Sequence, residues 1–305
     1  MPISKVTVLG GSGMLGNEVT RYLATNFPSL KITSTFRNSK SDGLVSQNLE
    51  YRKFEFKVEA KGELEVLLKD TCIVINCIGL IWQKSNSQTL ESDFYNINYQ
   101  LPMEIENLQK EMKFYHIHIG TDCVFNGQKT QRYMESDLPD AIDIYGVSKS
   151  LAEINLKMAT ILRCSVIGRS LQAKVSLLDW FLSQEENMEI KGYSNHFWNG
   201  IGTIQLARII GGLILNPLEM YQGIQHIIPS DVTSKYDLLK LFATEFNRSD
   251  LKIAESKQDI SISRVLGTLN PERNDTLWRN AGYKRPPSIS DIVKEVSSIN
   301  WMNLR

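Results

Sequence analysis

The sequence predicts an α/β protein with a Rossmann-type doubly wound parallel sheet and a smaller α+β substrate-binding region. Two observations carry this prediction. In the first half of the chain, short apolar runs typical of buried strands alternate with longer segments of helical periodicity, as in a parallel sheet wrapped by helices. A glycine-rich turn, Gly10 to Gly16, joins the first run to the first helical segment. We therefore expect a nucleotide-binding domain over residues 1–165 and a mainly substrate-binding region over residues 166–305, with a discontinuous boundary.

Each expected strand of the first half is a short apolar run, and each expected helix has apolar residues three or four positions apart. In the first helix, Leu15, Val19 and Leu23 fall on one face. The expected strands are Val6–Leu9, Lys31–Thr35, Phe54–Phe56, Cys72–Cys77, Phe114–Ile119 and Thr160–Cys164. The expected helices are Met14–Thr25, Glu63–Lys69, Phe94–Met112 and Ile144–Met158.

The second half changes its pattern, because its helices are separated by only brief strand candidates. It contains no repeats and no low-complexity linker, so we expect it to pack tightly on the first domain, with a ligand bound between the two. The expected elements are the helices Val175–Gln184, Thr203–Leu215 and Ser234–Phe246 and the strands Glu189–Gly192 and Gly223–Ile228.

The charge composition favours a small-molecule partner. Thirty-four basic and thirty-four acidic residues give a formal net charge of zero. Nucleic-acid and anionic-membrane proteins usually carry a basic excess, so neither partner is expected here.

The apolar runs predict no membrane segment and no secretion signal. The longest run, Ile209–Leu215, is interrupted by two glycines and is far shorter than the roughly 20 residues of a spanning helix. The N-terminus leads straight into the first strand and leaves no room for a signal peptide. The four cysteines lie in or beside apolar segments without metal-like spacing. We therefore expect a cytoplasmic protein with free thiols and no metal site.

The glycine-rich turn predicts a dinucleotide phosphate site. Gly10 allows a tight turn, Gly13 allows the backbone to approach a pyrophosphate, and Gly16 allows close contact between helix and strand. The start of the helix offers unpaired N–H groups to anionic oxygens. The expected cofactor contacts in this loop are Gly10, Ser12, Gly13, Met14 and Leu15.

The end of the second strand favours NADPH, with NADH as the alternative. A carboxylate at this position would bind the ribose 2′-hydroxyl of NAD, but the segment Ser34–Asn38 contains none. It carries Arg37 instead, whose guanidinium suits the 2′-phosphate of NADP. Residues 1–165 are therefore expected to bind NADP(H).

Tyr145 and Lys149 form the expected catalytic pair. Four residues apart on a helix, they project from one face about one turn apart. A nearby positive charge favours the phenolate and lowers the phenol pKa from its ordinary value near 10. Such a phenol can act as a proton donor during reduction of a ketone.

Residues that follow two buried strands complete the expected site. Thr121 follows the fifth strand, where its hydroxyl can bind the substrate oxygen, and Asp122, Cys123 and Val124 come next. Cys77, Ile78 and Gly79 follow the fourth strand, where the backbone must pass close to a nicotinamide ribose. On the helix that follows, Asn98 is expected to orient Lys149 directly or through a water molecule. Asn98, Tyr145 and Lys149 are also expected to contact the cofactor.

Four motifs together resemble a known family. GGSGMLG, INCIG, IGTDCVF and YGVSK, in this order and at these intervals, resemble the extended short-chain dehydrogenase/reductases, most closely the dTDP-4-dehydrorhamnose reductase group. The resemblance implies the family's catalytic triad at Thr121, Tyr145 and Lys149. It implies reduction of a 4-keto, 6-deoxy sugar nucleotide by NADPH in the synthesis of polysaccharide or glycan precursors.

The expected substrate contacts extend into the second half. Besides Tyr145, Thr121 and the three residues after it, they are Lys84, Arg163, His196 and Trp198. Lys84 and Arg163, together with Arg169, are candidates to bind a diphosphate. His196 and Trp198 belong to an aromatic cluster that suits either a nucleobase or packing at the domain interface.

Several alternatives stay open at this stage. The loop Leu80–Asn86 and the segment Gly192–Gly200 differ from the rhamnose-reductase pattern, so a reductase or epimerase of a UDP- or GDP-linked sugar is a rival interpretation. A non-catalytic NADP-binding regulator of the same fold is another, although retention of Thr121, Tyr145 and Lys149 argues against it. A homodimer is considered, but the sequence does not indicate the oligomeric state.

Overall fold

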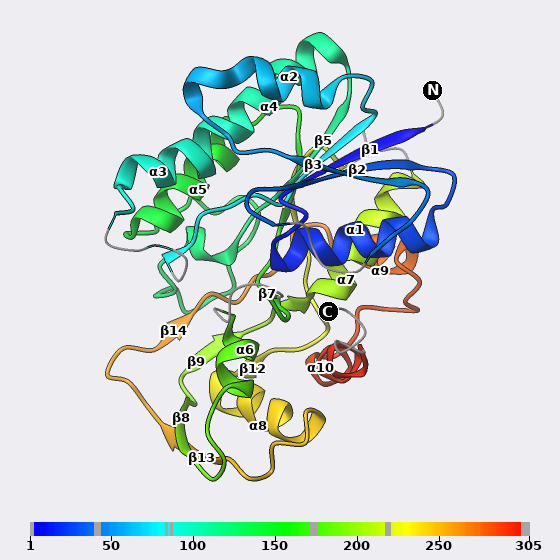
Figure 1. The fold of residues 1–305 in the computed structure, drawn as a ribbon. Helices are drawn as coiled ribbons and strands as arrows, with labels where there is room; N and C mark the ends of the chain where they lie inside the picture. The colour runs from blue at the N-terminus through cyan, green and yellow to red at the C-terminus, as the bar shows by residue number, and fades with distance from the viewer. Residues whose placement is uncertain are drawn as a thin grey trace.

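A seven-stranded parallel sheet forms the centre of the computed structural model (Figure 1), which describes residues 3–39, 44–82, 85, 88–170, 176–216 and 221–299. The strand order is β11-β6-β5-β4-β1-β2-β3. Successive strands are therefore added on one side of β1 up to β3 and on the other side from β4 onward. This arrangement confirms the predicted doubly wound α/β class. The strands are β1 Lys5–Leu9, β2 Lys31–Phe36, β3 Leu49–Lys53, β4 Ile73–Asn76, β5 Tyr115–Ile119, β6 Thr160–Arg163 and β11 Gly223–His226.

The prediction for the third strand was wrong. The strand is Leu49–Lys53, a mostly polar segment that pairs with β2 along the edge of the sheet. The expected strand, Phe54–Phe56, follows it. The Phe54 N–H still donates to the Phe36 carbonyl of β2 at 2.9 Å, and strand pairing ends there. Phe54 and Phe56 are buried against apolar residues of the neighbouring helices. Their apolar pattern therefore indicated core packing rather than strand pairing.

β11 joins the main sheet although it lies in the second half of the chain. It pairs in parallel with β6, from Gly223 beside Thr160 to His226 beside Arg163. The sequence located this strand but did not indicate its partner, because strand order depends on contacts between distant segments.

Helices cover both faces of the sheet (Figure 1). One layer contains α1 Met14–Asn26, α7 Thr203–Ile214 and α9 Pro271–Asn280. The other contains α2 Lys61–Leu68, α3 Glu91–Tyr95, α4 Leu101–Met112 and α5 Ile144–Asn155. Among the described residues, every helix is too short or too polar to cross a lipid bilayer.

The expected helix Phe94–Met112 begins earlier and is not uniform. A π-helical turn, Asn96–Gln100, connects α3 to α4. π-helical turns often occur at functional sites, and this one carries the buried Asn98.

The remaining elements form a smaller region below the sheet in Figure 1. Two of its short sheets pair β12 and β14 with β9, and β13 with β8. Val175, the expected start of one helix, lies outside the described residues. The elements are β7 Val166–Ile167, α6 Leu177–Leu182, β8 Glu189–Tyr193, β9 His196–Trp198, β10 Ile201–Gly202, β12 Thr233–Ser234, α8 Lys235–Glu245, β13 Lys252–Ser256, β14 Ile262–Ser263 and α10 Ile289–Ser298.

A fully buried ion pair ties α5 to the sheet. Arg163 on β6 has no exposed surface, and its Nε donates to Glu153 Oε2 of α5 at 2.9 Å. Its Nη1 lies 2.9 Å from His226 Nε2 on β11, and its guanidinium lies over the Phe125 ring. Glu153 Oε1 also accepts the Thr121 backbone N–H at 3.4 Å. The pair therefore connects α5, β6, β11 and the segment after β5.

We predict that Arg163→Met lowers the free energy of unfolding by about 3–5 kcal/mol, because it leaves the Glu153 carboxylate buried without a cation. Urea denaturation measures the change. The control is Lys61→Met, which breaks the surface ion pair between Lys61 and Glu104 and should cost at most about 1 kcal/mol. Equal losses in the two variants would contradict the importance of the buried pair.

Candidate active site

The phosphate loop has the backbone geometry that its glycines predict. Gly10 has a φ of +81°, and its N–H donates to Thr35 Oγ1 at 2.8 Å. A Cβ atom at Gly16 would lie 2.2 Å from the Gly10 carbonyl oxygen, so any side chain at position 16 would push the turn away from the start of α1. Gly13 precedes α1 and provides no side-chain cap. The first N–H groups of α1 can therefore face an anion, which fits a dinucleotide diphosphate.

The segment after β2 also suits NADP. Ser34 and Thr35 are buried and hydrogen-bonded, Ser34 Oγ to Thr20 Oγ1 at 2.9 Å. Arg37 is exposed just beyond the strand, with no carboxylate between it and the strand end. An exposed guanidinium thus lies just beyond the end of β2.

The residues after β4 lie against the phosphate loop. A Cβ atom at Gly10 would come within 3.2 Å of the Cys77 carbonyl carbon and 3.0 Å of Ile78 Cγ1. Gly79 has ordinary clearance, since its Cβ atom would lie 3.7 Å from Asn98 Oδ1. Burial raises the pKa of the Cys77 thiol to about 12, so this thiol is a neutral packing group. The loop after β1 and the loop after β4 lie side by side at the edge of the sheet where the strand order reverses.

Asn98 makes direct hydrogen bonds to the loop after β4 and to α5, and its expected water-mediated effect on Lys149 stays a prediction. Its Oδ1 accepts the Leu80 N–H at 2.9 Å, and its Nδ2 donates to the Leu80 carbonyl at 3.0 Å and to Ser148 Oγ at 3.0 Å. These bonds occupy the amide, so Asn98 holds the loop after β4 against α5 and does not contact Lys149.

Lys149 is buried between α5 and β5. Its Nζ donates to the Ile119 carbonyl at 2.7 Å and lies 3.2 Å from His118 Nε2. Burial lowers the Lys149 pKa to about 8, while Glu153 and Cys77 act in the opposite direction.

Tyr145 lies one turn before Lys149 and hydrogen-bonds to the Thr121 side chain. The expectation that Lys149 lowers the phenol pKa is wrong for this structure. Burial raises the Tyr145 pKa above its ordinary value, and the hydrogen bond to Thr121 only partly opposes the increase. Lys149 points to Ile119 and His118 instead. The phenol therefore stays protonated at neutral pH.

The residues after Thr121 fall into two groups. Burial raises the pKa of Asp122, and the nearby cations Arg264 and Lys235 oppose this effect. Cys123 Sγ lies 3.7 Å from Arg264 Nη1. Val124 was expected to contact substrate but is fully buried in an apolar cluster, because it anchors this segment to the core.

Four other expected substrate residues are placed as follows. Arg163 is unavailable to a diphosphate because its guanidinium is committed to the buried ion pair. Trp198 is 3% exposed and donates to Ser165 Oγ at 2.8 Å, so it packs in the core.

His196 lies beside the Tyr193 ring, with centroids 4.8 Å apart. Lys84 lies outside the described residues. Arg169, the third diphosphate candidate, forms an ion pair with Asp179 at 3.6 Å.

The structure adds two cations that sequence reasoning missed. Lys235 Nζ lies 5.4 Å from the centre of the Trp198 ring, and Arg264 Nε donates to the Phe125 carbonyl at 2.7 Å. Among the described residues, neither cation has a carboxylate within ion-pair distance. The sequence offered only a helix-start signal, Ser234 followed by Asp237, and this does not indicate which residues lie near Thr121.

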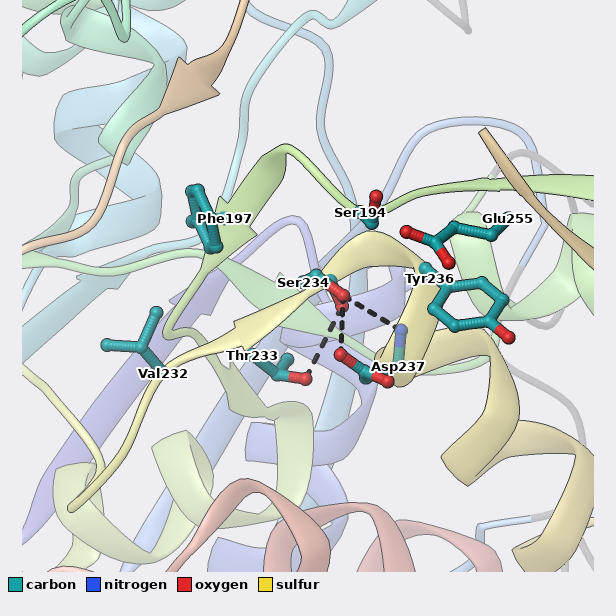
Figure 2. Close-up of a pocket in the computed structure, with 8 residues that line it drawn as sticks. All are labelled: Ser194, Phe197, Val232, Thr233, Ser234, Tyr236, Asp237 and Glu255. Atoms are coloured by element: carbon teal, nitrogen blue, oxygen red, sulfur yellow. Dashed lines mark hydrogen bonds between the residues drawn. The ribbon is translucent and has the colours of Figure 1, made fainter. Parts of the chain in front are cut away.

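A separate hollow of about 600 Å³ lies beside β9 and the start of α8, and Figure 2 shows its lining. Thr121, Tyr145 and Lys149 are not among its lining residues. Two carboxylates, Asp237 and Glu255, contribute to it, which disfavours a diphosphate there. In the described part of the chain, histidine, cysteine and acidic side chains form no group of three that could hold a metal ion.

Comparisons with known proteins agree with this arrangement. The family model described as RmlD substrate binding domain matches residues 4–264. The spore coat polysaccharide biosynthesis protein SpsK of Bacillus subtilis is 27% identical over 245 residues, which cover 77% of each chain.

Solved structures share the fold. A dTDP-4-dehydrorhamnose reductase from Clostridium acetobutylicum matches with a TM-score of 0.71 at 19% identity, covering 96% of this chain and 98% of that one. A dTDP-4-dehydrorhamnose reductase from Bacillus anthracis, in complex with NADP, matches with the same TM-score and coverage at 16% identity. A UDP-glucose 4-epimerase from Thermotoga maritima has a TM-score of 0.72 at 17% identity, covering 99% and 100%.

Proposed function

This chain belongs to the RmlD substrate-binding-domain family, and we propose that it is an NADPH-dependent reductase of a nucleotide-activated 4-keto, 6-deoxy sugar. One observation carries the proposal: Thr121, which follows β5 at the carboxyl edge of the sheet, lies beside the Tyr145 side chain of α5, and Lys149 follows Tyr145 one helical turn later. Ligands of doubly wound sheets bind at this edge.

The residues of the chain divide the chemistry between them. The nicotinamide, when bound, supplies a hydride to the carbonyl carbon. Tyr145 donates its phenolic proton to the carbonyl oxygen, and Thr121 hydrogen-bonds that oxygen. The phenol is protonated at neutral pH, which is the form that reduction requires before proton transfer. Oxidation would instead require the phenolate.

The cofactor and the pathway are parts of the same proposal. Arg37 and the missing carboxylate after β2 support NADPH over NADH, and the Bacillus anthracis reductase of the same fold binds NADP. The relative SpsK is named for spore coat polysaccharide biosynthesis, which supports a product used in polysaccharide precursors. We further place the enzyme in the cytoplasm, and a homodimer stays a prediction.

The cofactor preference can be tested at Arg37. We predict that the unmodified protein binds NADPH more tightly than NADH and that Arg37→Ala narrows the difference in Kd about tenfold, as expected for loss of one charged hydrogen bond. Isothermal titration with both cofactors measures this. Arg279→Ala, which removes an exposed arginine of α9, should leave the preference unchanged. Equal affinities in the unmodified protein would rule out the NADPH assignment.

The proton donor can be tested at Tyr145. Tyr145→Phe should lower the single-turnover rate of NADPH oxidation about 100-fold or more, because it removes the transferable proton, while cofactor affinity stays nearly unchanged. Lys149→Met should impair both. The substrates are dTDP-, UDP-, GDP- and CDP-linked keto-sugars, tested as a panel. A near-normal rate in the phenylalanine variant would mean that another group donates the proton.

The substrate diphosphate can be tested at the two cations beside Asp122. We predict that Lys235→Met and Arg264→Gln each raise KM for the nucleotide sugar about tenfold or more, because each removes a charged donor. The affinity for NADPH should not change. Lys240→Met on the same helix removes a cation paired with Asp237 on the surface and serves as the control. If KM were unaffected by both substitutions, the diphosphate would have to bind elsewhere.

A further inference from the structure

Three buried side chains form a continuous chain from β4 to the catalytic helix. Asn76, at the end of β4, places its Nδ2 3.3 Å from His118 Nδ1 on β5. The other ring nitrogen, His118 Nε2, lies 3.2 Å from Lys149 Nζ on α5. Asn76 and His118 are each 1% exposed, so solvent cannot substitute for these contacts. Every polar atom here must therefore be matched to its neighbour.

The orientation of the Asn76 amide is determined by the backbone. The Ile78 N–H can only donate, and it points at Asn76 Oδ1 from 3.1 Å. The amide nitrogen of Asn76, which also can only donate, must therefore face His118 Nδ1. His118 Nδ1 accepts this bond, so the ring proton lies on Nε2.

The proton on His118 Nε2 determines which protonation state of Lys149 is favoured. An N–H group 3.2 Å from Lys149 Nζ repels an ammonium, whereas a neutral amine can accept its hydrogen bond. The Ile119 carbonyl accepts one Nζ hydrogen in either state. The contact with His118 therefore favours the neutral amine over the ammonium.

We propose that Asn76 and His118 are positioning residues that fix the Nε2–H form of the imidazole and thereby make Lys149 exchange its proton near neutral pH. The proposal deepens the proposed reductase function and rests on it for its kinetic consequence. It makes Lys149 an ionisable partner of Tyr145 rather than a permanent positive charge.

The other groups around Lys149 are consistent with this assignment. Burial lowers its pKa to about 8, while Glu153 on α5 and Cys77 after β4 raise it. His118 is neutral, because burial, Lys149 and His116 hold its pKa well below the ordinary value. Burial and Lys149 lower the pKa of His116, on the same strand, to about 3. A group whose pKa is lowered to about 8 loses its charge as the pH rises through that value. The ammonium, one helical turn from Tyr145, stabilises the phenolate that remains after proton transfer, so kcat/KM should fall above about pH 8.

Asn76→Asp provides the sharpest test. A carboxylate accepts a proton rather than donating one, so it should move the ring proton of His118 to Nδ1 and turn the Nε2 lone pair toward Lys149. The ammonium then gains an acceptor and is also attracted by the new carboxylate, so the alkaline limb of kcat/KM should move upward by about one pH unit or more. Asn76→Leu removes the donor to His118 Nδ1, so the ring proton can occupy either nitrogen. The alkaline limb should then move upward by a smaller amount.

The matched control is Asn274→Asp on α9. Asn274 is also a buried asparagine, and it bonds the Ile228 N–H at 3.1 Å and the Ile228 carbonyl at 3.2 Å. Its substitution should lower stability without moving the limb. A merely structural role for Asn76 would likewise lower kcat/KM at every pH and leave the limb in place, and that result would overturn the proposal.

Nuclear magnetic resonance gives a readout that needs neither substrate nor turnover. The chain has only four histidines, so the ring nitrogens of ¹⁵N-histidine-labelled protein can be assigned from His118→Phe or by elimination of the other three. We expect the Nε2–H form of His118 in the unmodified protein and the Nδ1–H form in Asn76→Asp. The Nε2 signal should also follow the titration of Lys149 near pH 8.

An Nδ1–H or doubly protonated ring in the unmodified protein would overturn the proposal, as would a change of tautomer that leaves the titration of Lys149 unmoved. Absence of reductase activity with every keto-sugar would refute the proposed function alone, because the resonance experiment would still report the tautomer and the titration.

Discussion

The buried Glu153–Arg163 ion pair is the constraint on which the arrangement of the candidate active site depends. Two charges without exposed surface are tolerated only when each has close partners. That requirement fixes α5 against β6, and His226 extends it to β11. The same carboxylate accepts the Thr121 backbone N–H, so the threonine of the site is positioned by the group that stabilises the fold.

One face of α5, which this ion pair holds against the sheet, carries three ionisable side chains. Tyr145, Lys149 and Glu153 follow one another at four-residue intervals, so they lie in a row along the helix. Burial acts on the first two in opposite directions, raising the pKa of the phenol and lowering that of the amine. In both cases burial favours the neutral form. A neutral phenol is the form that can donate a proton to a developing alkoxide.

Although the chain has no net charge, positively charged side chains gather near Asp122. Two cations from separate segments, Lys235 and Arg264, lie near the buried carboxylate of Asp122. A protein with no net charge thus has a locally positive region next to the hydroxyls of Thr121 and Tyr145. Such local charge can bind an anionic ligand without the general basicity that attracts nucleic acid.

The sequence by itself determined those features that depend on local pattern. The glycines indicated the tight turn between β1 and α1, because Gly10 has a positive φ and a side chain at Gly16 would collide with the Gly10 carbonyl. Alternating apolar runs predicted five of the first six strands, and the four-residue spacing of Tyr145 and Lys149 placed both on one helix. These properties follow from residues close in the chain.

Only the tertiary structure decided the features that depend on distant partners. Arg163 was expected to bind a ligand, but Glu153 and His226 bury it, and neither partner can be inferred from its neighbours in sequence. The pKa of Tyr145 likewise depends on burial by the whole domain. Lys235 and the contact between His118 and Lys149 escaped prediction for the same physical reason. A side chain's charge state and role are set by what surrounds it in space, and sequence patterns describe only what surrounds it along the chain.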